Sequence, residues 1–183
     1  DDQSGDSGAL QAAWRRYAND GTPLGARETL VATGRAGNHW LAKVACRPGG
    51  GFVVAGVRPG AEGPGFSAFV QRYDASGAPE GDTLSAFERA TGDQFAPVVA
   101  VAPDDTIQVA WEDTVAADAD TVIALRAFGL ATTGARHEVF AKAGTDTQGP
   151  IVATHPLTGV TLVGGIVDNR LKLASAEGDA TPT

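Results

Sequence analysis

Short stretches in which apolar residues are continuous or alternate with polar ones fill most of the chain, and turns rich in Gly, Pro and Asp separate them. In the best example, Phe69, Gln71 and Tyr73 would lie on one face of a β-strand, and Val70 and Arg72 on the other. Side chains alternate in this way because successive residues of a strand point to opposite sides of the sheet. Runs of about five to seven residues bounded by turn residues are typical of strands, so the pattern predicts an all-β protein.

Segments that end in an aromatic residue recur along the chain and are the first sign of an internal repeat. The three segments are residues 14–17, 70–73 and 125–128. They end at Tyr17, Tyr73 and Phe128, which are 56 and then 55 residues apart. A Gly-x-Pro-x-Gly turn follows the first two segments, at 21–25 and 77–81. Pro fixes φ in such a turn, and Gly supplies a positive φ.

A second set of segments recurs with nearly the same period. Residues 42–45, 97–100 and 150–153 align, and each is followed by a turn that opens on Pro and then by an apolar run, at 51–55, 106–111 and 159–163. The repeat also favours a strand over residues 9–17, whose spacing would otherwise suit a short helix. In this register, His39 would share one polar structural position with Gln94 and Gln148.

Each repeat of about 55 residues holds four short strands, which is typical of a β-propeller blade. The predicted fold class is all-β, a propeller-like array of about three four-stranded antiparallel blades. The chain is predicted to be one repeat domain over 1–183, with an outer strand pair at 11–31, blades at 41–87 and 95–140, and a partial blade at 150–175. Because a closed ring usually needs four to eight blades, another chain or strand exchange is expected to complete it. Two copies would make six blades.

Residues 70–81, 94–100 and 107–111 carry the clearest version of the repeat. This unit resembles a degenerate repeat of large secreted and surface-exposed bacterial proteins, and the resemblance is good over 66–111. It is weaker in the outer copies, where Gly56 and Gly164 stand at the position of Trp111. The resemblance implies propeller blades that often accompany calcium-binding or adhesive modules, and a secreted, periplasmic or cell-surface location. It implies no catalytic residue.

Charge and composition exclude several classes of function. The 183 residues carry a net charge of -8, whereas a nucleic-acid backbone requires a cationic face. The single cysteine, Cys46, excludes a disulfide framework and a multi-cysteine metal site within the chain, and it is predicted to be a small buried hydrophobe. No apolar run approaches 18 residues, so no membrane span is predicted. The chain does not begin with Met and shows no leader, which predicts a processed chain or a piece of a longer one.

No constellation of residues predicts catalysis. Gly-Asp-Ser-Gly at 5–8 matches the nucleophile motif of trypsin-like proteases, but Ser7 stands at the start of the chain and is interpreted as part of a loop. The histidines, His39, His137 and His155, are too far apart in sequence to form a local zinc-ligand pair. The chain is therefore predicted not to be an enzyme. The enzymatic alternative is a propeller hydrolase, which would need arginines and carboxylates around a central channel.

Two groups of residues are candidate ligand-binding groups. The candidate platforms for sugar stacking are Trp14, Trp40 and Trp111, although packing in the core or at an edge would also explain them. The candidate calcium ligands are Glu112, Asp113, Asp118 and Asp120, which crowd one loop between strands. Calcium prefers six to eight oxygen ligands, and closely spaced carboxylates supply them. A solvated acidic loop is the alternative, because no Asp-x-Asp-x-Asp-Gly string is present; no cofactor other than calcium is expected.

The predicted function is that of a non-catalytic, exported interaction or scaffold module. Such a module would assemble with itself or with a larger complex, because the open edges of its sheets offer unpaired backbone groups to a partner. A carbohydrate- or calcium-dependent adhesin of the lectin type is the first alternative, and the propeller hydrolase is the second. The fold alone cannot choose among them, because function depends on the sites that a fold carries.

Overall fold

The computed structural model describes residues 10–31, 37–60, 65–86, 92–114, 121–129, 133–140 and 147–176, apart from the side chains of 26–30. Within these ranges the regular secondary structure consists of β-strands alone, and every pair of hydrogen-bonded strands is antiparallel. The prediction of an all-β protein is confirmed. The same part of the chain contains no helix that is long and apolar enough to cross a lipid bilayer.

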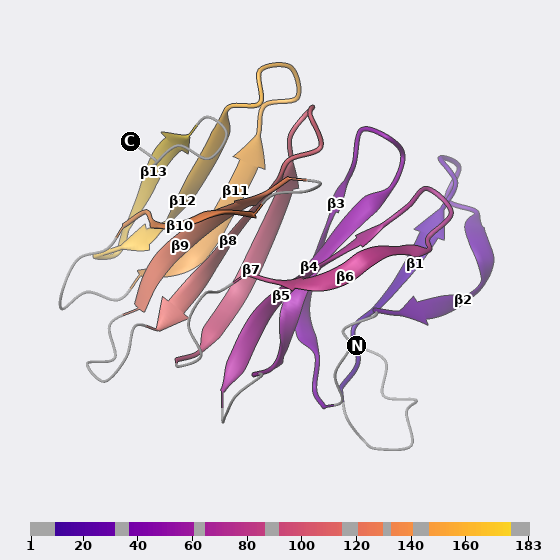
Figure 1. Cartoon of the computed structure of the whole chain (residues 1–183), viewed down its shortest axis with the longest axis horizontal. Coiled ribbons are helices and arrows are strands. Elements are labelled where there is room, and N and C mark those ends of the chain that lie inside the picture. The colour runs from indigo at the N-terminus through magenta and orange to yellow at the C-terminus, as the bar shows by residue number, and fades with distance from the viewer. Residues whose placement is uncertain are drawn as a thin grey trace.

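The strands of the described residues form four sheets, numbered I to IV in chain order. Sheet I contains β1 (Ala13–Tyr17) and β2 (Pro23–Leu30), and sheet II contains β3 (Trp40–Cys46), β4 (Phe52–Pro59), β5 (Phe66–Tyr73) and β6 (Pro79–Ser85). Sheet III contains β7 (Gln94–Val101), β8 (Ile107–Thr114), β9 (Thr121–Phe128) and β10 (Thr133–Glu138), and sheet IV contains β11 (Thr147–Thr154), β12 (Thr161–Val167) and β13 (Arg170–Ala176). In every sheet, strands that follow one another in the chain are hydrogen-bonded neighbours. Figure 1 shows the sheets side by side in chain order, and the described strands do not close into a ring.

The first strand of sheets II, III and IV is bent by an irregularity at the same place. The residues with positive φ at this place are Leu41 (56°), Ala96 (47°) and Gly149 (61°). The strand pairing shifts around them, between Trp40 and Lys43 in β3, Phe95 and Val98 in β7, and Gln148 and Ile151 in β11. Such bulges bend a strand and increase its twist. Their common position defines which residues of the three sheets are equivalent.

The bulges correct one predicted alignment. His39, Gln94 and Thr147 are equivalent, and their exposed fractions are 1%, 2% and 0%. The prediction that Gln148 shares this position is wrong, because Gln148 lies one residue further along and is exposed. The pKa of His39 is lowered, mainly by burial and then by the charge of Arg58, so the imidazole is neutral at pH 7. The position is therefore a buried polar site inside the stack of sheets.

Apolar side chains between successive sheets form the core. The cluster between sheets II and III includes Val53, Ala55, Ala68 and Val70 from sheet II and Ile107, Val109, Trp111, Ala124 and Phe128 from sheet III. A second cluster lies between sheets I and II, and a third between sheets III and IV. Each sheet thus has an upstream face, toward the preceding sheet, and a downstream face, toward the following one. Strands β4 and β8 are buried on both faces over most of their length, which explains the continuous apolar runs at 52–57 in β4 and 109–111 in β8.

Sheet IV departs from the repeat by one extra residue in its first turn. The closing backbone hydrogen bond joins Arg47 to Gly51 in sheet II, Ala102 to Thr106 in sheet III, and His155 to Val160 in sheet IV. For this reason Gly165, and not the predicted Gly164, is equivalent to Trp111. A Cβ at Gly165 would lie 1.9 Å from Cδ1 of Ile123. The isoleucine therefore fills the space that the indole fills in sheet III.

Candidate functional site

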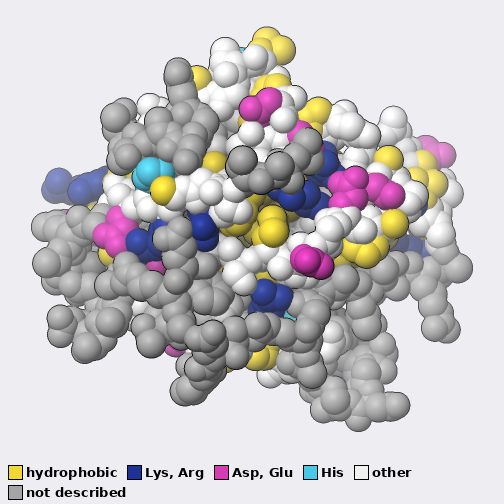
Figure 2. Space-filling view, in the orientation of Figure 1, with side chains coloured by type: hydrophobic (Ala, Val, Ile, Leu, Met, Phe, Trp, Pro, Cys, Tyr) yellow, Lys and Arg dark blue, Asp and Glu magenta, His cyan; other side chains and the backbone are white. Residues whose placement is uncertain are grey.

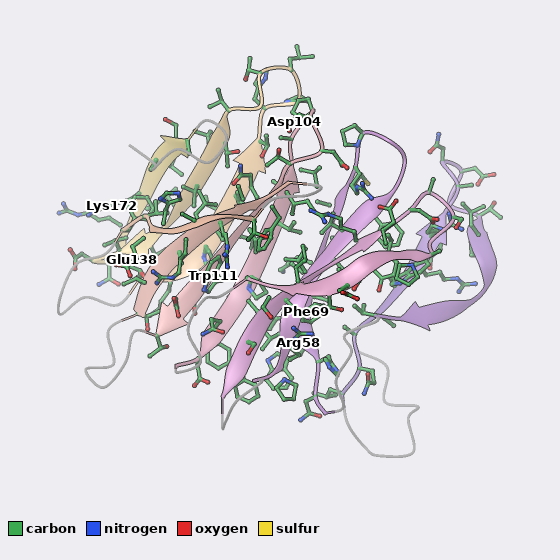
Figure 3. All side chains as sticks on the ribbon, in the orientation of Figure 1. Arg58, Phe69, Asp104, Trp111, Glu138 and Lys172 are labelled. Carbon is green, nitrogen blue, oxygen red and sulfur yellow. The ribbon has the colours of Figure 1, made fainter. Side chains whose placement is uncertain are left out.

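The three candidate tryptophans do not form one surface. Trp111 is fully buried between sheets II and III, so protein atoms cover both faces of its ring (Figure 3). Trp40 packs edge-on against Phe66, with ring centroids 4.7 Å apart. Trp14 packs edge-on against Phe52, with ring centroids 4.9 Å apart, and lines a groove between sheets I and II. The structure thus leaves Trp14 as the tryptophan that borders a groove.

Asp113 belongs to a buried ion pair. Nε of Arg136 donates a hydrogen bond to Oδ2 of Asp113 at 2.8 Å, and the two side chains are only 9% and 7% exposed. Arg136 also donates to Oε1 of Glu138 at 2.8 Å. Burial by itself lowers the pKa of Arg136, but Glu138 and Asp113 together outweigh burial, and the pKa is raised. The pair joins β10 to β8 across β9, so it stabilises sheet III.

The other candidate calcium ligands are not gathered around Asp113. Glu112 precedes Asp113 in β8, so its carboxylate lies on the opposite face, where Oε1 accepts a hydrogen bond from the N–H of Gly149 at 2.8 Å. Asp118 and Asp120 lie outside the described residues. Among the described residues, no group of three or more His, Cys, Asp or Glu side chains is placed to hold a metal ion. Calcium binding by this loop stays a prediction.

We expect the substitution Asp113→Asn to leave any calcium affinity of the chain unchanged, because Arg136 already neutralises this carboxylate. Isothermal titration with calcium at millimolar concentration, on the wild type and on Asp113→Asn and Asp120→Asn variants that retain the wild-type circular dichroism, measures this. No heat from the wild type would remove the calcium hypothesis altogether. Binding that is lost in Asp113→Asn alone would contradict the expectation, since the ion would then displace Arg136.

Two equivalent arginines connect neighbouring sheets. The guanidinium of Arg16 donates to the carbonyl of Ala75, in a turn of sheet II. In the same way, the guanidinium of Arg72 donates to the carbonyls of Phe128, at 3.4 Å, and Gly129, at the end of β9. Burial is the main cause that lowers the pKa of Arg72. These side chains clamp one sheet to the next, a role that the sequence analysis did not assign to them.

A third arginine, Arg47, holds the end of β3 against sheet III. Its Nε donates to Oδ1 of Asp105 at 2.9 Å, and its guanidinium also pairs with Glu80. The hydrogen bond that Arg47 donates to Asp105 is the largest cause that raises the pKa of Arg47. Figure 2 shows acidic and basic side chains side by side on the face of the molecule that it draws, with apolar atoms exposed between them. Arg47 therefore has a structural role, because its two carboxylate partners, Glu80 and Asp105, belong to sheets II and III.

The downstream face of sheet IV is apolar and exposed. Leu162, Ile166, Leu171 and Leu173 are 48%, 47%, 64% and 57% exposed. Their equivalents in sheet II, which are Val53, Val57, Ala68 and Val70, are all 0% exposed because sheet III covers them. The last sheet thus presents to solvent the face that sheets II and III bury. We call these four residues of sheet IV the outer face.

A groove of about 750 Å³ lies between sheet I and strands β3 and β4 of sheet II. Its lining includes Trp14, Arg15 and Tyr17 from β1 and Val44, Cys46 and Val54 from the upstream face of sheet II. In the described part of the chain, β1 pairs with β2 alone, whereas its counterparts β5, β9 and β13 each have a further strand on the inner side, namely β4, β8 and β12. The groove therefore lies where the two inner strands of a complete sheet would stand.

Exposure along β3 confirms that no inner strand of sheet I covers it in the described structure. Val44 is 65% exposed, whereas its equivalents Val99 and Val152 are half-buried. The prediction that Cys46 is buried is wrong, because the thiol-bearing residue is exposed on the groove wall, while its equivalent Val101 is half-buried. The missing cover, and not the local sequence, accounts for the difference.

Comparisons with known proteins find no matching family model, curated protein or solved structure. The resemblance to secreted repeat proteins therefore stays a prediction. The two surfaces that sequence reasoning missed are the groove and the outer face. The signal that points to them is the repeat itself, because no described strand before β1 corresponds to β4, β8 or β12, and sheet IV carries leucines in alternation.

Proposed function

We propose that the chain is a non-catalytic interaction module built as an array of propeller-like blades, and that it assembles with a second copy or within a larger complex. Sheets I to IV are the blades in this proposal. The first strand β7 contacts both β3 and β11, and the three strands border a hollow of about 520 Å³, as the inner strands of propeller blades do around a central channel. An exported location follows from the resemblance of the repeat alone and is part of the proposal.

The exposed outer face of sheet IV is the observation that carries this function. Monomeric proteins seldom expose contiguous apolar patches unless these bind something. Here the patch has a built-in reference, since the equivalent positions of sheet II are fully buried by a neighbouring sheet. A sheet of the same kind is therefore the natural partner for the outer face. A second copy of the chain offers such sheets, and so does another repeat protein.

A carbohydrate-binding function is the second candidate, and one observation favours it. Trp14, Arg15 and Tyr17 line the groove together with Lys43. Aromatic rings beside cations would suit an acidic sugar. However, Trp14 packs edge-on against Phe52, so Phe52 already covers part of the indole surface on which a sugar would stack. A glycan array that shows no binding would remove this candidate.

We expect the purified chain to form dimers or larger assemblies as its concentration rises, because burying the outer face removes apolar surface from water. Light scattering coupled to size exclusion, or sedimentation velocity, measures the assembly. The double variant Leu162→Glu and Ile166→Glu should shift the equilibrium toward the monomer. Both side chains are nearly half exposed in the chain alone, so their replacement should leave the monomer folded.

The matched control is Leu157→Glu, which places the same charge on a leucine that is 85% exposed in a turn. This variant should assemble like the wild type. A chain that stays monomeric at all concentrations, with no partner recovered by the wild type that the double variant fails to recover, would contradict the proposed function.

A further inference from the structure

Beside the groove, the described strands of sheet I make up only half of a four-stranded sheet. β1 forms its ladder with β2 on one side, and no other strand of the described chain pairs with its other side. An unpaired strand edge offers N–H and C=O groups to an added strand, which is the basis of β-augmentation. The groove therefore combines an open edge with an apolar wall.

Successive sheets contact each other through two kinds of surface, and the groove wall and the outer face are an exposed example of each. Inside the chain, the downstream face of each sheet meets the upstream face of the next. On the groove wall, Phe52 and Val54 are equivalent to Ile107 and Val109, which pack in the cluster between sheets II and III. Leu162 on the outer face is equivalent to Val53, a member of the same cluster. The chain thus carries an open copy of each half, at opposite ends of its stack of sheets (Figure 1).

We propose that the groove of one copy accepts the β11–β12 hairpin of a second copy, with β12 antiparallel to the open edge of β1. Strands β1 and β2 then take the place of β13, which gives a composite four-stranded sheet in the order β11-β12-β1-β2. When both copies donate their hairpins, the exchange is reciprocal and the assembly closes as a dimer. This inference rests on the proposed self-association and names the surfaces that carry it.

The register of the composite sheet suits the side chains that would meet. In sheet IV, Gly164 lies opposite Leu173, and a Cβ on Gly164 would be 2.6 Å from Cδ2 of that leucine. Trp14 is the equivalent of Leu173 in sheet I, so in the composite sheet the indole would lie against Gly164. The residue equivalent to Gly164 is Ala55 in sheet II, where it lies opposite Val70. In sheet III it is Ala110, which lies opposite Leu125. The largest third-strand side chain would therefore meet the smallest partner.

The exchange replaces one antiparallel ladder by another, so the number of backbone hydrogen bonds changes little. The favourable term is the burial of Leu162 and Ile166 against the groove wall with its exposed Val44. Release of β13 takes only the small side chains of Ala174 and Ala176 out of the cluster between sheets III and IV, because Leu171 and Leu173 are already more than half exposed. Apolar burial therefore favours the exchanged dimer.

Cys46 reports on the groove directly, because it is the only cysteine of the chain and lies exposed on the groove wall. Its reaction with a thiol reagent is expected to be fast in the dilute monomer and to slow as the protein concentration reaches the range in which dimers form. Hydrogen exchange followed by mass spectrometry should show protection gained in β1 and lost in β13 over the same range.

The variant Val44→Asp tests the groove wall, and Leu157→Asp is its matched control, because both side chains are well exposed in the monomer. Burying an unpaired carboxylate should weaken dimerisation by about tenfold or more in Val44→Asp. The control should dimerise like the wild type, and the thermal midpoints of both monomers should match it.

The outcomes separate this inference from the proposed function. If the chain dimerises while Cys46 stays as reactive as in the monomer, or while Val44→Asp dimerises normally, the groove is not the acceptor and only this inference is overturned. If β13 keeps its protection in the dimer, the strand exchange is overturned. If the chain is monomeric at every concentration, neither this inference nor self-association survives.

Discussion

Replacing Trp111 by alanine is expected to destabilise the fold by about 3–5 kcal/mol, which is the range for truncating a large aromatic side chain in a core. The indole is 0% exposed and lies between sheets II and III, among side chains of both. Its removal leaves a cavity that rigid strands on each side cannot close. Urea unfolding followed by circular dichroism measures the loss.

Two variants control for the chemistry of the change. Trp111→Phe should cost less than Trp111→Ala, because the ring remains and the indole Nε1 has no hydrogen-bond partner among the described residues. Trp40→Ala removes the same side chain at a position that is only half-buried, and its cost should also be smaller. Equal costs for Trp111→Ala and Trp40→Ala would show that the packing between sheets II and III does not hold the fold together.

Replacing Arg136 by methionine is expected to cost about 3–5 kcal/mol, because it leaves the carboxylate of Asp113 buried without its partner. The double variant Asp113→Leu and Arg136→Met should recover most of this loss, since a buried ion pair is commonly replaceable by apolar side chains of similar volume. Urea midpoints of the wild type, both single variants and the double variant complete the cycle.

The matched control is Arg170→Met, which removes an exposed arginine at the start of β13. Its effect should stay within about 0.5 kcal/mol. A double variant that is no more stable than Arg136→Met would mean that Glu138, and not Asp113, is the partner whose loss matters, and the interpretation of the buried pair would be wrong.

The strands could be predicted because their signal is local. Alternation between polar and apolar residues follows from the two-residue period of an extended backbone, and turns that open on Pro or contain Gly follow from restricted φ. Alignment of the repeats failed by one residue where a turn gained one residue, between His155 and Val160. That insertion shifted Gly165 relative to the predicted Gly164. The predicted position of Gln148 failed separately, because the bulge at Gly149 makes Thr147 the equivalent of His39.

The candidate site could not be predicted in the same way. Trp14 and Trp111 have similar local sequences around them, yet one borders a groove and the other lies inside the core. The pairing of Asp113 with Arg136 depends on strand β9 placing β8 and β10 on its two sides. Cys46 is exposed because no described strand of sheet I covers β3, and the residues near Cys46 in the sequence give no sign of this.

By itself, the sequence determined that this protein is all-β, where most strands begin and end, and that the strands come in repeats. These properties depend on interactions between residues that are close in the chain, so a single sequence contains them. The tertiary structure decided which faces are buried, because burial of each sheet depends on a neighbouring sheet about one repeat away. Sheet II buries its downstream face and sheet IV does not, although the two faces are almost equally apolar. That difference leaves the downstream face of sheet IV exposed in the described structure.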